Sequence, residues 1–301
     1  MRKKIDKINN KLPTKDITKD DLENKIKLTS DKRRKKEVVI KKDVVINKNN
    51  LPLICGPNGL ESLKLGLGFA EFISKLKLRF MRTHIFKPLT FPYRSNQYSE
   101  SGITGIEWIK EIKSQFPSLI FVCEITELQH LDTLSKHVDI LQIGTRNMQN
   151  FELLRECSRS KKPLILKRHF GSSLRDLLGA AEHILLDGNK KLILCERGIV
   201  APHTHRETSR YILDIQSIPA LQEITNLPVI VDPSHASFWA PWVPPLAKAS
   251  IAVGADGLII ESHPKPSKSK VDPLQPLNYE TFKNLLSSLR KISKLDNKII
   301  I

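Results

Sequence analysis

The sequence lacks an apolar run that could cross a membrane, and it contains only four cysteines. No stretch of about 18 consecutive apolar residues occurs, so no membrane partner is expected. The cysteine spacing fits neither a zinc motif nor a disulfide framework. Buried, reduced thiols and the lack of an apolar signal segment after the basic first residues predict a cytoplasmic protein. The four cysteines are Cys55, Cys123, Cys157 and Cys195.

Acidic residues are also scarce: 32 Asp and Glu accompany 49 Lys and Arg, for a net charge of +17. Residues 1–50 hold 17 basic and 8 acidic residues, so about half of the excess lies there. Such an arm could touch nucleic acid, but no aromatic residue that could stack on a base precedes Phe69. We therefore expect a solvated arm and no nucleic-acid partner. The remaining positive charge suits a protein with anionic substrates.

The first 36 residues are polar, charged and poor in large apolar side chains. This composition is typical of disordered segments, so we interpret residues 1–36 as a basic, mostly disordered arm. Two β-branched triplets around a polar tripeptide then predict a β-hairpin at residues 37–46. We assign residues 37–301, which include this hairpin, to one domain.

From Leu51 onwards, apolar segments of strand length alternate with amphipathic helical segments. Each expected strand is apolar on both faces, as in a parallel sheet covered by helices. The regular alternation favours a (β/α)8 TIM barrel over a doubly wound sheet, and the hairpin would close its N-terminal end. The expected strands are Leu51–Cys55, Arg79–Ile85, Leu119–Ile125, Ile140–Ile143, Pro163–Lys167, Lys191–Cys195, Pro228–Val231 and Gly257–Glu261. The expected helices are Glu61–Lys75, Thr104–Gln115, Leu128–His137, Phe151–Ser160, Leu174–Leu186, Ile218–Thr225, Leu246–Val253 and Tyr279–Ile292.

Cationic side chains recur where the expected strands end. In a barrel these ends converge on one mouth. Like charges gathered there repel one another unless an anion lies among them, and guanidinium and ammonium groups match phosphate and carboxylate oxygens. The pattern predicts an anion site, although any one of these residues alone could be an ordinary surface cation. The residues are Arg82, Lys87, Arg146, Lys167, Arg168 and Arg197.

A second group comprises one imidazole and two carboxylates from late in the chain: His235, Glu261 and Asp272. Such ligands suit a divalent metal ion, namely Mn²⁺, Fe²⁺ or Zn²⁺. Their spacing forms no compact motif. The residues alone therefore leave metal binding open against hydrogen bonding or proton transfer.

Several long segments resemble, in order along the chain, the 3-deoxy-7-phosphoheptulonate (DAHP) synthases of the type I-beta group. The longest is Asp139-Ile-Leu-Gln-Ile-Gly-Thr-Arg-Asn-Met-Gln-Asn-Phe-Glu-Leu-Leu-Arg155. The resemblance covers about residues 40–292 and rests on many motifs, so it is specific. The other segments are Ile54-Cys-Gly-Pro-Asn-Gly-Leu-Glu-Ser62, Phe86-Lys-Pro-Leu-Thr-Phe-Pro-Tyr93, Leu194-Cys-Glu-Arg-Gly198, Pro228-Val-Ile-Val-Asp-Pro-Ser-His-Ala236 and Gly254-Ala-Asp-Gly-Leu-Ile-Ile-Glu-Ser-His-Pro264.

The resemblance implies a barrel enzyme that condenses phosphoenolpyruvate with erythrose 4-phosphate and water and releases phosphate. This reaction opens the shikimate pathway to aromatic amino acids. The resemblance further implies that phosphoenolpyruvate is bound by Arg82, Lys87, Arg146, Lys167 and Arg197, beside Arg168, and that Thr90 contacts the sugar phosphate. It implies a metal held by His235, Glu261 and Asp272. Glu124, Lys167 and His235 are the candidate catalytic groups for proton transfer.

The sequence departs from the family at three positions. Asn58 stands where the family has a cysteine ligand, so the metal could be weakly bound or dispensable. Leu89 replaces an arginine for the phosphate of the second substrate, a charge that Arg94 could supply. Pro273 replaces a glycine directly after Asp272.

Two alternatives remain open. A 3-deoxy-octulosonate 8-phosphate (KDO8P) synthase would perform the same addition on arabinose 5-phosphate, but Lys87-Pro-Leu-Thr90 stands in place of the loop that those enzymes carry. A degenerate barrel would bind anions without catalysis. A homo-oligomer, a dimer or tetramer, is also expected from the resemblance and from the paired apolar residues Leu153 and Leu154.

Overall fold

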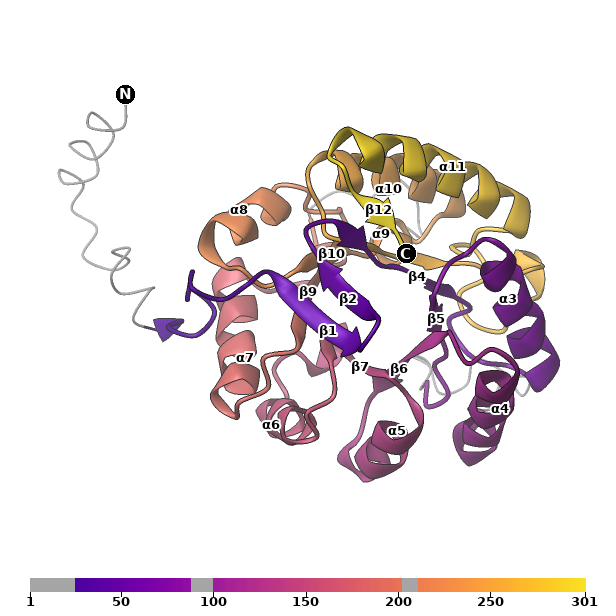
Figure 1. The fold of residues 1–301 in the computed structure, drawn as a ribbon, viewed down its shortest axis with the longest axis horizontal. Helices are drawn as coiled ribbons and strands as arrows, with labels where there is room; N and C mark the ends of the chain where they lie inside the picture. Colours follow the sequence, from indigo (N-terminus) through magenta and orange to yellow (C-terminus); the bar gives the residue numbers. More distant parts are fainter. Residues whose placement is uncertain (1–24, 88–99, 202–210) are drawn as a thin grey trace.

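The computed structural model of the protein describes residues 25–87, 100–201 and 211–301. Eight parallel strands form a closed barrel with helices around it, which confirms the (β/α)8 prediction (Figure 1). Strands that follow one another in sequence are neighbours in the barrel, and the ring closes between β11 and β4. No helix in the described part of the chain is long and apolar enough to span a membrane.

The barrel strands lie close to their predicted positions. The largest difference is at β5, which was expected to reach Ile85 and ends at Arg82. Beyond that point the side chain of His84, in place of a backbone carbonyl, accepts the N–H of Glu124 on the neighbouring strand. The strands are β4 (Leu53–Gly56), β5 (Phe80–Arg82), β6 (Ile120–Ile125), β7 (Ile140–Ile143), β8 (Leu164–Lys167), β9 (Leu192–Glu196), β10 (Val229–Val231) and β11 (Leu258–Glu261).

The predicted helices are present between the strands, and capping side chains explain several of their starts. Ser173 forms a capping box with Asp176 at the start of α7, and Ser62 caps α3. A short helix after β10, α9 (Pro233–Ser237), was not predicted. The other helices are α3 (Leu63–Lys75), α4 (Gly102–Gln115), α5 (Leu131–His137), α6 (Phe151–Arg159), α7 (Leu174–Leu186), α8 (Ser217–Ile224), α10 (Val243–Ala252) and α11 (Tyr279–Leu295).

Alternation along the strands divides the core into two layers. Side chains such as Ile54, Phe80 and Ile120 fill the inside of the barrel. Their neighbours, such as Leu53 and Phe121, pack against the helices in the larger outer core. Both faces of each strand are therefore buried, which is why the strands read as continuous apolar runs.

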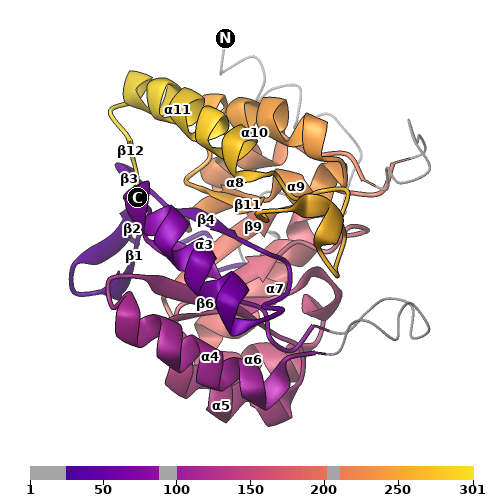
Figure 2. The ribbon, with the colours of Figure 1, turned by 90° about the vertical axis from the view of Figure 1, so that its right-hand side faces the viewer.

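The predicted hairpin is present and covers one end of the barrel. It consists of β1 (Glu37–Lys41) and β2 (Val44–Asn47), paired antiparallel. Val38, Val44 and Ile46 belong to the core cluster inside the barrel. The hairpin lies across the barrel axis in Figure 1 and at one end of the molecule in Figure 2. Water is thus excluded from the N-terminal ends of the strands, and the opposite end is left for a site.

Residues 25–36, the last part of the arm that was expected to be mostly disordered, pack against the barrel. Ile26 and Thr29 are almost completely buried. The carboxylate of Glu182 on α7 accepts hydrogen bonds from the backbone N–H groups of Leu28 and Thr29 at 2.9 and 2.6 Å. This segment is ordered because a helix of the barrel satisfies its backbone; residues 1–24 lie outside the described part.

Two further observations complete the fold. The chain end pairs with the start of the barrel through β12 (Ile299–Ile300) and β3 (Asn50–Leu51), which are parallel. Leu153 and Leu154 are fully buried in the outer core. They therefore support the fold of one chain and do not supply the oligomer contact for which they were singled out.

Candidate active site

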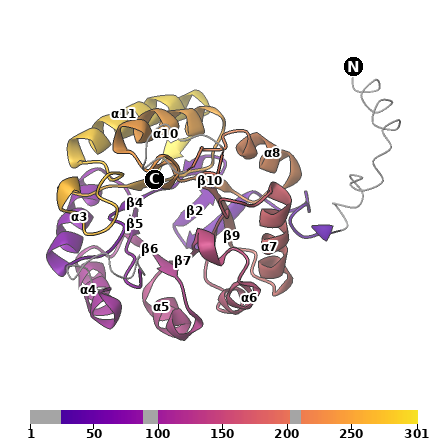
Figure 3. The same ribbon diagram turned by 180° about the vertical axis from the view of Figure 1, so that it is seen from behind.

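The candidate site lies at the C-terminal ends of the barrel strands, the end viewed in Figure 3. Arg82 ends β5, Lys167 ends β8, Arg197 follows β9 directly and Glu261 ends β11. Because parallel strands end at the same rim, these side chains converge. All four are less than 9% exposed, although charged groups normally remain in water. Such burial indicates a site that is complete only with a ligand.

Arg82 is the largest fully buried side chain described. Its Nη2 lies 3.2 Å from Oε2 of Glu261, and its Nε donates to the carbonyl of Pro57 over 3.3 Å. Its Nη1 is buried and has no hydrogen-bond partner among the described residues. A buried guanidinium N–H without an acceptor is unfavourable, so this atom indicates an anionic ligand.

Glu124, on β6, is held in a small polar cradle. Lys87 Nζ lies 2.9 Å and Gln142 Nε2 lies 3.4 Å from its Oε2. A Cβ at Gly144 would lie 2.0 Å from its Oε1, so only glycine leaves room for the carboxylate. Burial acts to raise the pKa of Glu124, but the ammonium groups of Lys87 and Lys167 outweigh it and lower that pKa. Glu124 is therefore ionised at neutral pH and can accept a proton.

Lys167, Asp232 and His235 form a buried chain of charged and polar groups. One oxygen of Asp232, Oδ2, accepts from Lys167 Nζ at 2.5 Å and lies 2.8 Å from His235 Nδ1. Its other oxygen accepts the backbone N–H of His235 and thereby caps α9. Burial acts to raise the pKa of Asp232, but His235 and Lys167 hold it well below its usual range. An ionised Asp232 thus fixes the positions of both partners.

His235 and Glu261 are neighbours, and the pKa of each side chain is shifted far from its usual value. Burial, aided by the charge of Lys167 and opposed by Asp232, lowers the pKa of His235 to about 3. The neutral ring carries its proton on Nδ1, toward Asp232, so Nε2 presents a lone pair. Burial, opposed by Arg82, raises the pKa of Glu261 to about 8. The Oε2 atom of Glu261 lies 3.9 Å from Nε2 of His235, so an acidic group and a neutral imidazole are neighbours in the site.

The predicted metal ligands do not form a ready ligand set. Asn58 Nδ2 donates to Asp272 Oδ2 over 2.9 Å, and the Gln275 side-chain amide donates to Oε2 of Glu261. Across residues 25–87, 100–201 and 211–301, no group of three or more His, Cys, Asp or Glu side chains is arranged to hold a metal ion. His235 and Glu261 are brought together, and Asp272, whose charge helps to raise the pKa of Glu261, is hydrogen-bonded to Asn58. The residues present therefore do not fit a preformed transition-metal site.

Arg197 carries a second unmet donor. Its guanidinium carbon lies 4.2 Å from the ring centre of Tyr211, and its Nη2 donates to the carbonyl of His235 over 3.0 Å. Within the described chain, its buried Nη1 has no hydrogen-bond partner. Arg197 is thus held by its neighbours and retains a donor for an anion.

Arg168 is placed differently. Its Nη1 donates to Glu196 Oε2 at 2.9 Å and to Asp214 Oδ2 at 2.7 Å, while Nε and Nη2 both donate to the carbonyl of Ser172. All its nitrogens therefore have acceptors within the protein. This arrangement links the end of β8 to the end of β9 and favours a structural role over contact with substrate.

The two remaining predicted site residues are Arg146 and Thr90. Arg146 lies in the short 3-10 helix η2 (Thr145–Asn147), directly after β7, and so belongs to the same rim. Thr90 lies outside the described residues, as do the departures at Leu89 and Arg94.

The structure adds residues to which the sequence reasoning gave no role. Asp232 joins Lys167 to His235, Gln275 contacts Glu261, and His84 and Gln142 contact Glu124. For Asp232, the only signal in the sequence was its position directly after an expected strand. Contacts of neutral side chains across the barrel carry no spacing pattern.

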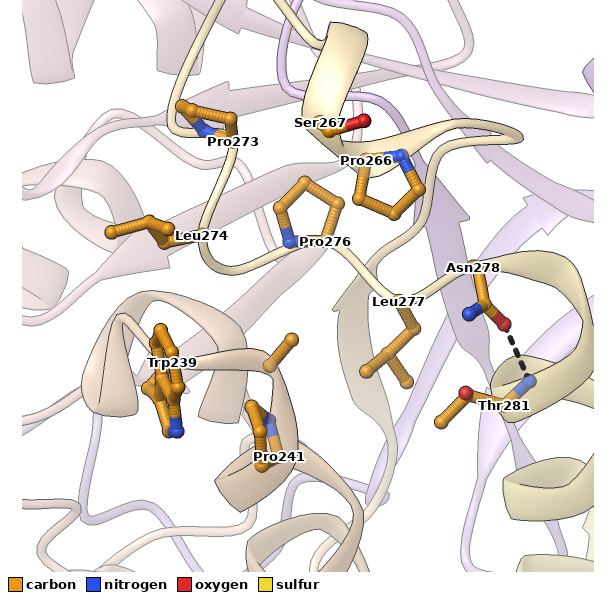
Figure 4. A pocket seen from close by; sticks show the side chains of 11 residues that line it. Trp239, Pro241, Pro266, Ser267, Pro273, Leu274, Pro276, Leu277, Asn278 and Thr281 are labelled. Carbon is orange, nitrogen blue, oxygen red and sulfur yellow. Dashed lines mark hydrogen bonds between the residues drawn. The ribbon is translucent and has the colours of Figure 1, made fainter.

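An apolar pocket is lined in part by residues of the loop that also carries Asp272 and Gln275 (Figure 4). It has a volume of about 610 Å³. Pro273, Leu274 and Pro276 line it from the loop, and Trp239 lines it from the segment after α9. The loop is thus polar toward the barrel axis and apolar toward this pocket.

Buried guanidinium and ammonium groups at the strand ends of a (β/α)8 barrel, with an ionised carboxylate among them, define an enzyme site for a small anionic substrate. The sequence profile of the DAHP synthetase I family matches residues 27–296. The chain belongs to this family.

Relatives agree with this assignment. The phospho-2-dehydro-3-deoxyheptonate aldolase of Thermotoga maritima is 37% identical over 251 residues, which cover 83% of this chain and 72% of that protein. The 2-dehydro-3-deoxyphosphooctonate aldolase of Desulfotalea psychrophila is 29% identical over 261 residues, covering 80% and 89%. The chain is therefore more similar to the first, heptonate, enzyme than to the second.

Solved structures show the same fold. The crystal structure of the Thermotoga maritima DAHP synthase has a TM-score of 0.81 at 35% identity, covering 88% of this chain and 75% of that one. A truncated form of the same organism's 3-deoxy-D-arabino-heptulosonate 7-phosphate synthase has a TM-score of 0.82 at 33% identity, covering 92% and 100%.

Proposed function

We propose that this protein is a DAHP synthase, which condenses phosphoenolpyruvate with erythrose 4-phosphate and water to give 3-deoxy-D-arabino-heptulosonate 7-phosphate and phosphate. The observation that carries the proposal is the pair of buried guanidinium donors without partners, on Arg82 and Arg197, at the strand ends of a barrel of this family. An assay of phosphate release with both substrates tests it.

Phosphoenolpyruvate would occupy the cationic rim. Its phosphate and carboxylate together carry more negative charge than one residue can neutralise, so several cations must contact it. Arg82 and Arg197 have donors available, and Lys87 and Lys167 supply ammonium groups close enough to Glu124 to lower its pKa. Arg146, in η2 after β7, completes this set by resemblance to the family.

The reaction needs one group that takes a proton from water and one that donates a proton to a developing oxyanion. Carbon 3 of phosphoenolpyruvate attacks the aldehyde, carbon 2 becomes cationic, and water then adds to carbon 2. Glu124, ionised beside Lys87, is suited to accept the water proton. Lys167 and the protonated Glu261 are the acidic groups available for the aldehyde oxygen and the leaving phosphate.

Metal dependence follows from the chemistry of the ligand positions. A bound Mn²⁺, Fe²⁺ or Zn²⁺ would polarise the aldehyde oxygen. Here an amide at Asn58 takes the place of a thiolate and is engaged with Asp272. We propose that a divalent metal is bound weakly or is dispensable, and that His235, Glu261 and Asp272 act through hydrogen bonds and proton transfer.

The acceptor sugar is the less constrained part of the proposal. Thr90 would contact its phosphate, and Arg94 would supply the charge that Leu89 lacks. Arabinose 5-phosphate, the KDO8P synthase acceptor, is the alternative, because a 2-dehydro-3-deoxyphosphooctonate aldolase is also similar over most of this chain. The higher identity to a heptonate enzyme favours erythrose 4-phosphate.

The wider setting is proposed on the same basis. Residues 37–301 form the catalytic domain, and the basic residues before them have no assigned partner. Four buried thiols suit a reducing cytoplasm. We infer a homo-oligomer from the family alone; light scattering that showed a strict monomer at micromolar concentration would contradict it.

A further inference from the structure

His84 is a buried histidine that the roles above leave unused. It lies two residues beyond the end of β5, and its side chain is 1% exposed. Its two ring nitrogens face different neighbours: Nδ1 faces the backbone of Glu124, and Nε2 faces the side chain of Gln142. His84 therefore contacts the backbone of the proposed proton acceptor and one of the two side chains that hold its carboxylate.

The hydrogen bond from the Glu124 N–H to His84 Nδ1, at 2.9 Å, fixes the state of the ring. An accepting Nδ1 carries no proton, so the neutral ring carries its proton on Nε2. Burial, with the charges of Arg82, Lys87 and Lys167 around it, holds the pKa of His84 well below its usual range. The ring is therefore a neutral donor at Nε2 throughout the physiological range.

This hydrogen bond takes the place of a backbone–backbone hydrogen bond between β5 and β6. β5 pairs with β6 only as far as Arg82 opposite Val122. The N–H of Thr83 still donates to the carbonyl of Val122 over 2.8 Å, so the regular parallel pattern would give the Glu124 N–H the carbonyl of Thr83 as its acceptor. Nδ1 of His84 supplies the missing acceptor and so holds the backbone of Glu124 at the end of its strand.

Gln142 provides the second half of the arrangement. Its Nε2 lies 3.4 Å from Oε2 of Glu124 and 3.4 Å from Nε2 of His84, while its Oε1 is buried without a hydrogen-bond partner in the described chain. An N–H of His84 facing an N–H of Gln142 is unfavourable. Rotation of the amide by about 180° would turn its carbonyl oxygen toward the His84 donor.

The two orientations match two states of Glu124. While the carboxylate is ionised, the amide N–H of Gln142 donates to it. Once Glu124 is protonated, its O–H can donate to the rotated carbonyl, which also accepts from Nε2 of His84. We propose that His84 and Gln142 are positioning residues that hold the Glu124 carboxyl group both with and without its proton.

This inference rests on the proposed function for the role of Glu124. In that reaction, water adds to carbon 2 through an electron pair on its oxygen, and one water proton moves to Oε2 of Glu124. The hydroxyl stays on the substrate carbon, and the proton stays on Glu124 until it is returned to solvent. No further reactant is required.

Three substitutions of His84 in the protein distinguish the role of its Nδ1 from the role of its Nε2. His84→Asn keeps an acceptor near Nδ1, His84→Gln keeps a donor near Nε2, and His84→Leu removes both. We expect kcat to fall about 100-fold in His84→Leu and about tenfold in each polar variant. KM for phosphoenolpyruvate should stay within about threefold, because the cationic residues are untouched.

A matched control is His263→Leu. His263 is also buried, lies just after β11, and accepts the N–H of Lys265 on its Nδ1 over 3.0 Å. We expect His263→Leu to lower the free energy of unfolding about as much as His84→Leu does, but to change kcat less than about twofold. If His84→Asn and His84→Gln lose as much kcat as His84→Leu, or if the loss appears in KM alone, the proposal is wrong.

A measurement without substrate separates failure of this inference from failure of the proposed function. Nitrogen NMR of His84 in the free protein should show a neutral ring protonated on Nε2 between about pH 6 and pH 8. A ring protonated on Nδ1 cannot accept the Glu124 N–H and would overturn the proposal, whether or not the protein turns over erythrose 4-phosphate.

Discussion

The side-chain amide of Asn58 donates a hydrogen bond of 2.9 Å to Oδ2 of Asp272. A thiolate at this position would be an acceptor and a strong metal ligand, whereas the amide is neutral and already engaged. We therefore expect activity to survive exhaustive chelation with EDTA, and Asn58→Cys to increase the metal that co-purifies with the protein. Metal analysis and steady-state rates before and after chelation provide the measurement.

The opposite outcome is equally clear. If chelation abolishes activity and Mn²⁺ restores it, the remaining side chains hold an essential ion and Asn58 has been misread. Asn58→Cys offers a further comparison. The substitution removes the amide that donates to Asp272 and adds a thiolate ligand, so chelation should inhibit the variant more than the original protein.

Gly144 is expected to tolerate no side chain. A Cβ there would lie 2.0 Å from Oε1 of Glu124, so Gly144→Ala must displace the carboxylate. We expect kcat to fall about 100-fold, in line with the loss of a general base. Gly68→Ala is the control, since a Cβ at Gly68 meets nothing within 4 Å. Gly68→Ala should keep its activity and gain roughly 0.5–1 kcal/mol of stability. If kcat falls equally in Gly144→Ala and Gly68→Ala, the loss does not come from a clash with Glu124.

Arg168 is expected to matter for stability more than for substrate binding. Arg168→Ala leaves Glu196 buried without its cation, which typically costs about 3–5 kcal/mol of unfolding free energy. Chemical denaturation measures this loss. Arg197→Ala, by comparison, should raise KM for phosphoenolpyruvate with a smaller change in stability. A stable Arg168→Ala protein with a strongly raised KM would show that this arginine binds the substrate.

His235 predicts a specific dependence of stability on pH. Its pKa is about 3 in the folded protein, below the usual value of about 6.5 in an unfolded chain. Between these values the unfolded state binds a proton that the folded state does not, so stability falls as the pH is lowered from about 6.5 toward 3. His235→Asn should make the unfolding free energy less dependent on pH in that window. An unchanged slope would contradict a buried, neutral His235.

Much of the fold was accessible from the sequence because local signals agreed with one another. The apolar run between Asp139 and Gly144 predicted β7, and the helix after Ser173 was placed at Leu174–Leu186, as observed. The hairpin followed from its two β-branched triplets. The five-residue helix α9 was missed because it is too short to show a period, although Asp232 and Pro233 form a cap and a first turn typical of a helix start.

The site was accessible only in part. Strand ends placed the cationic residues at one rim, but sequence position does not show whether a cation meets a ligand or a carboxylate. Arg82 retains an open donor and Arg168 does not, and only the contacts of Glu196 and Asp214 distinguish them. The packing of residues 25–36 could not be predicted for a similar reason: Glu182, more than 150 positions away, accepts hydrogen bonds from the backbone of Leu28 and Thr29.

The most direct test of the account is phosphate release by the purified protein, measured with phosphoenolpyruvate and each aldose phosphate in turn. We predict release with erythrose 4-phosphate, at least tenfold faster than with arabinose 5-phosphate, and loss of about 100-fold in Glu124→Gln. Faster release with arabinose 5-phosphate would assign the chain to the octulosonate reaction. No release with either sugar would contradict the proposed enzyme.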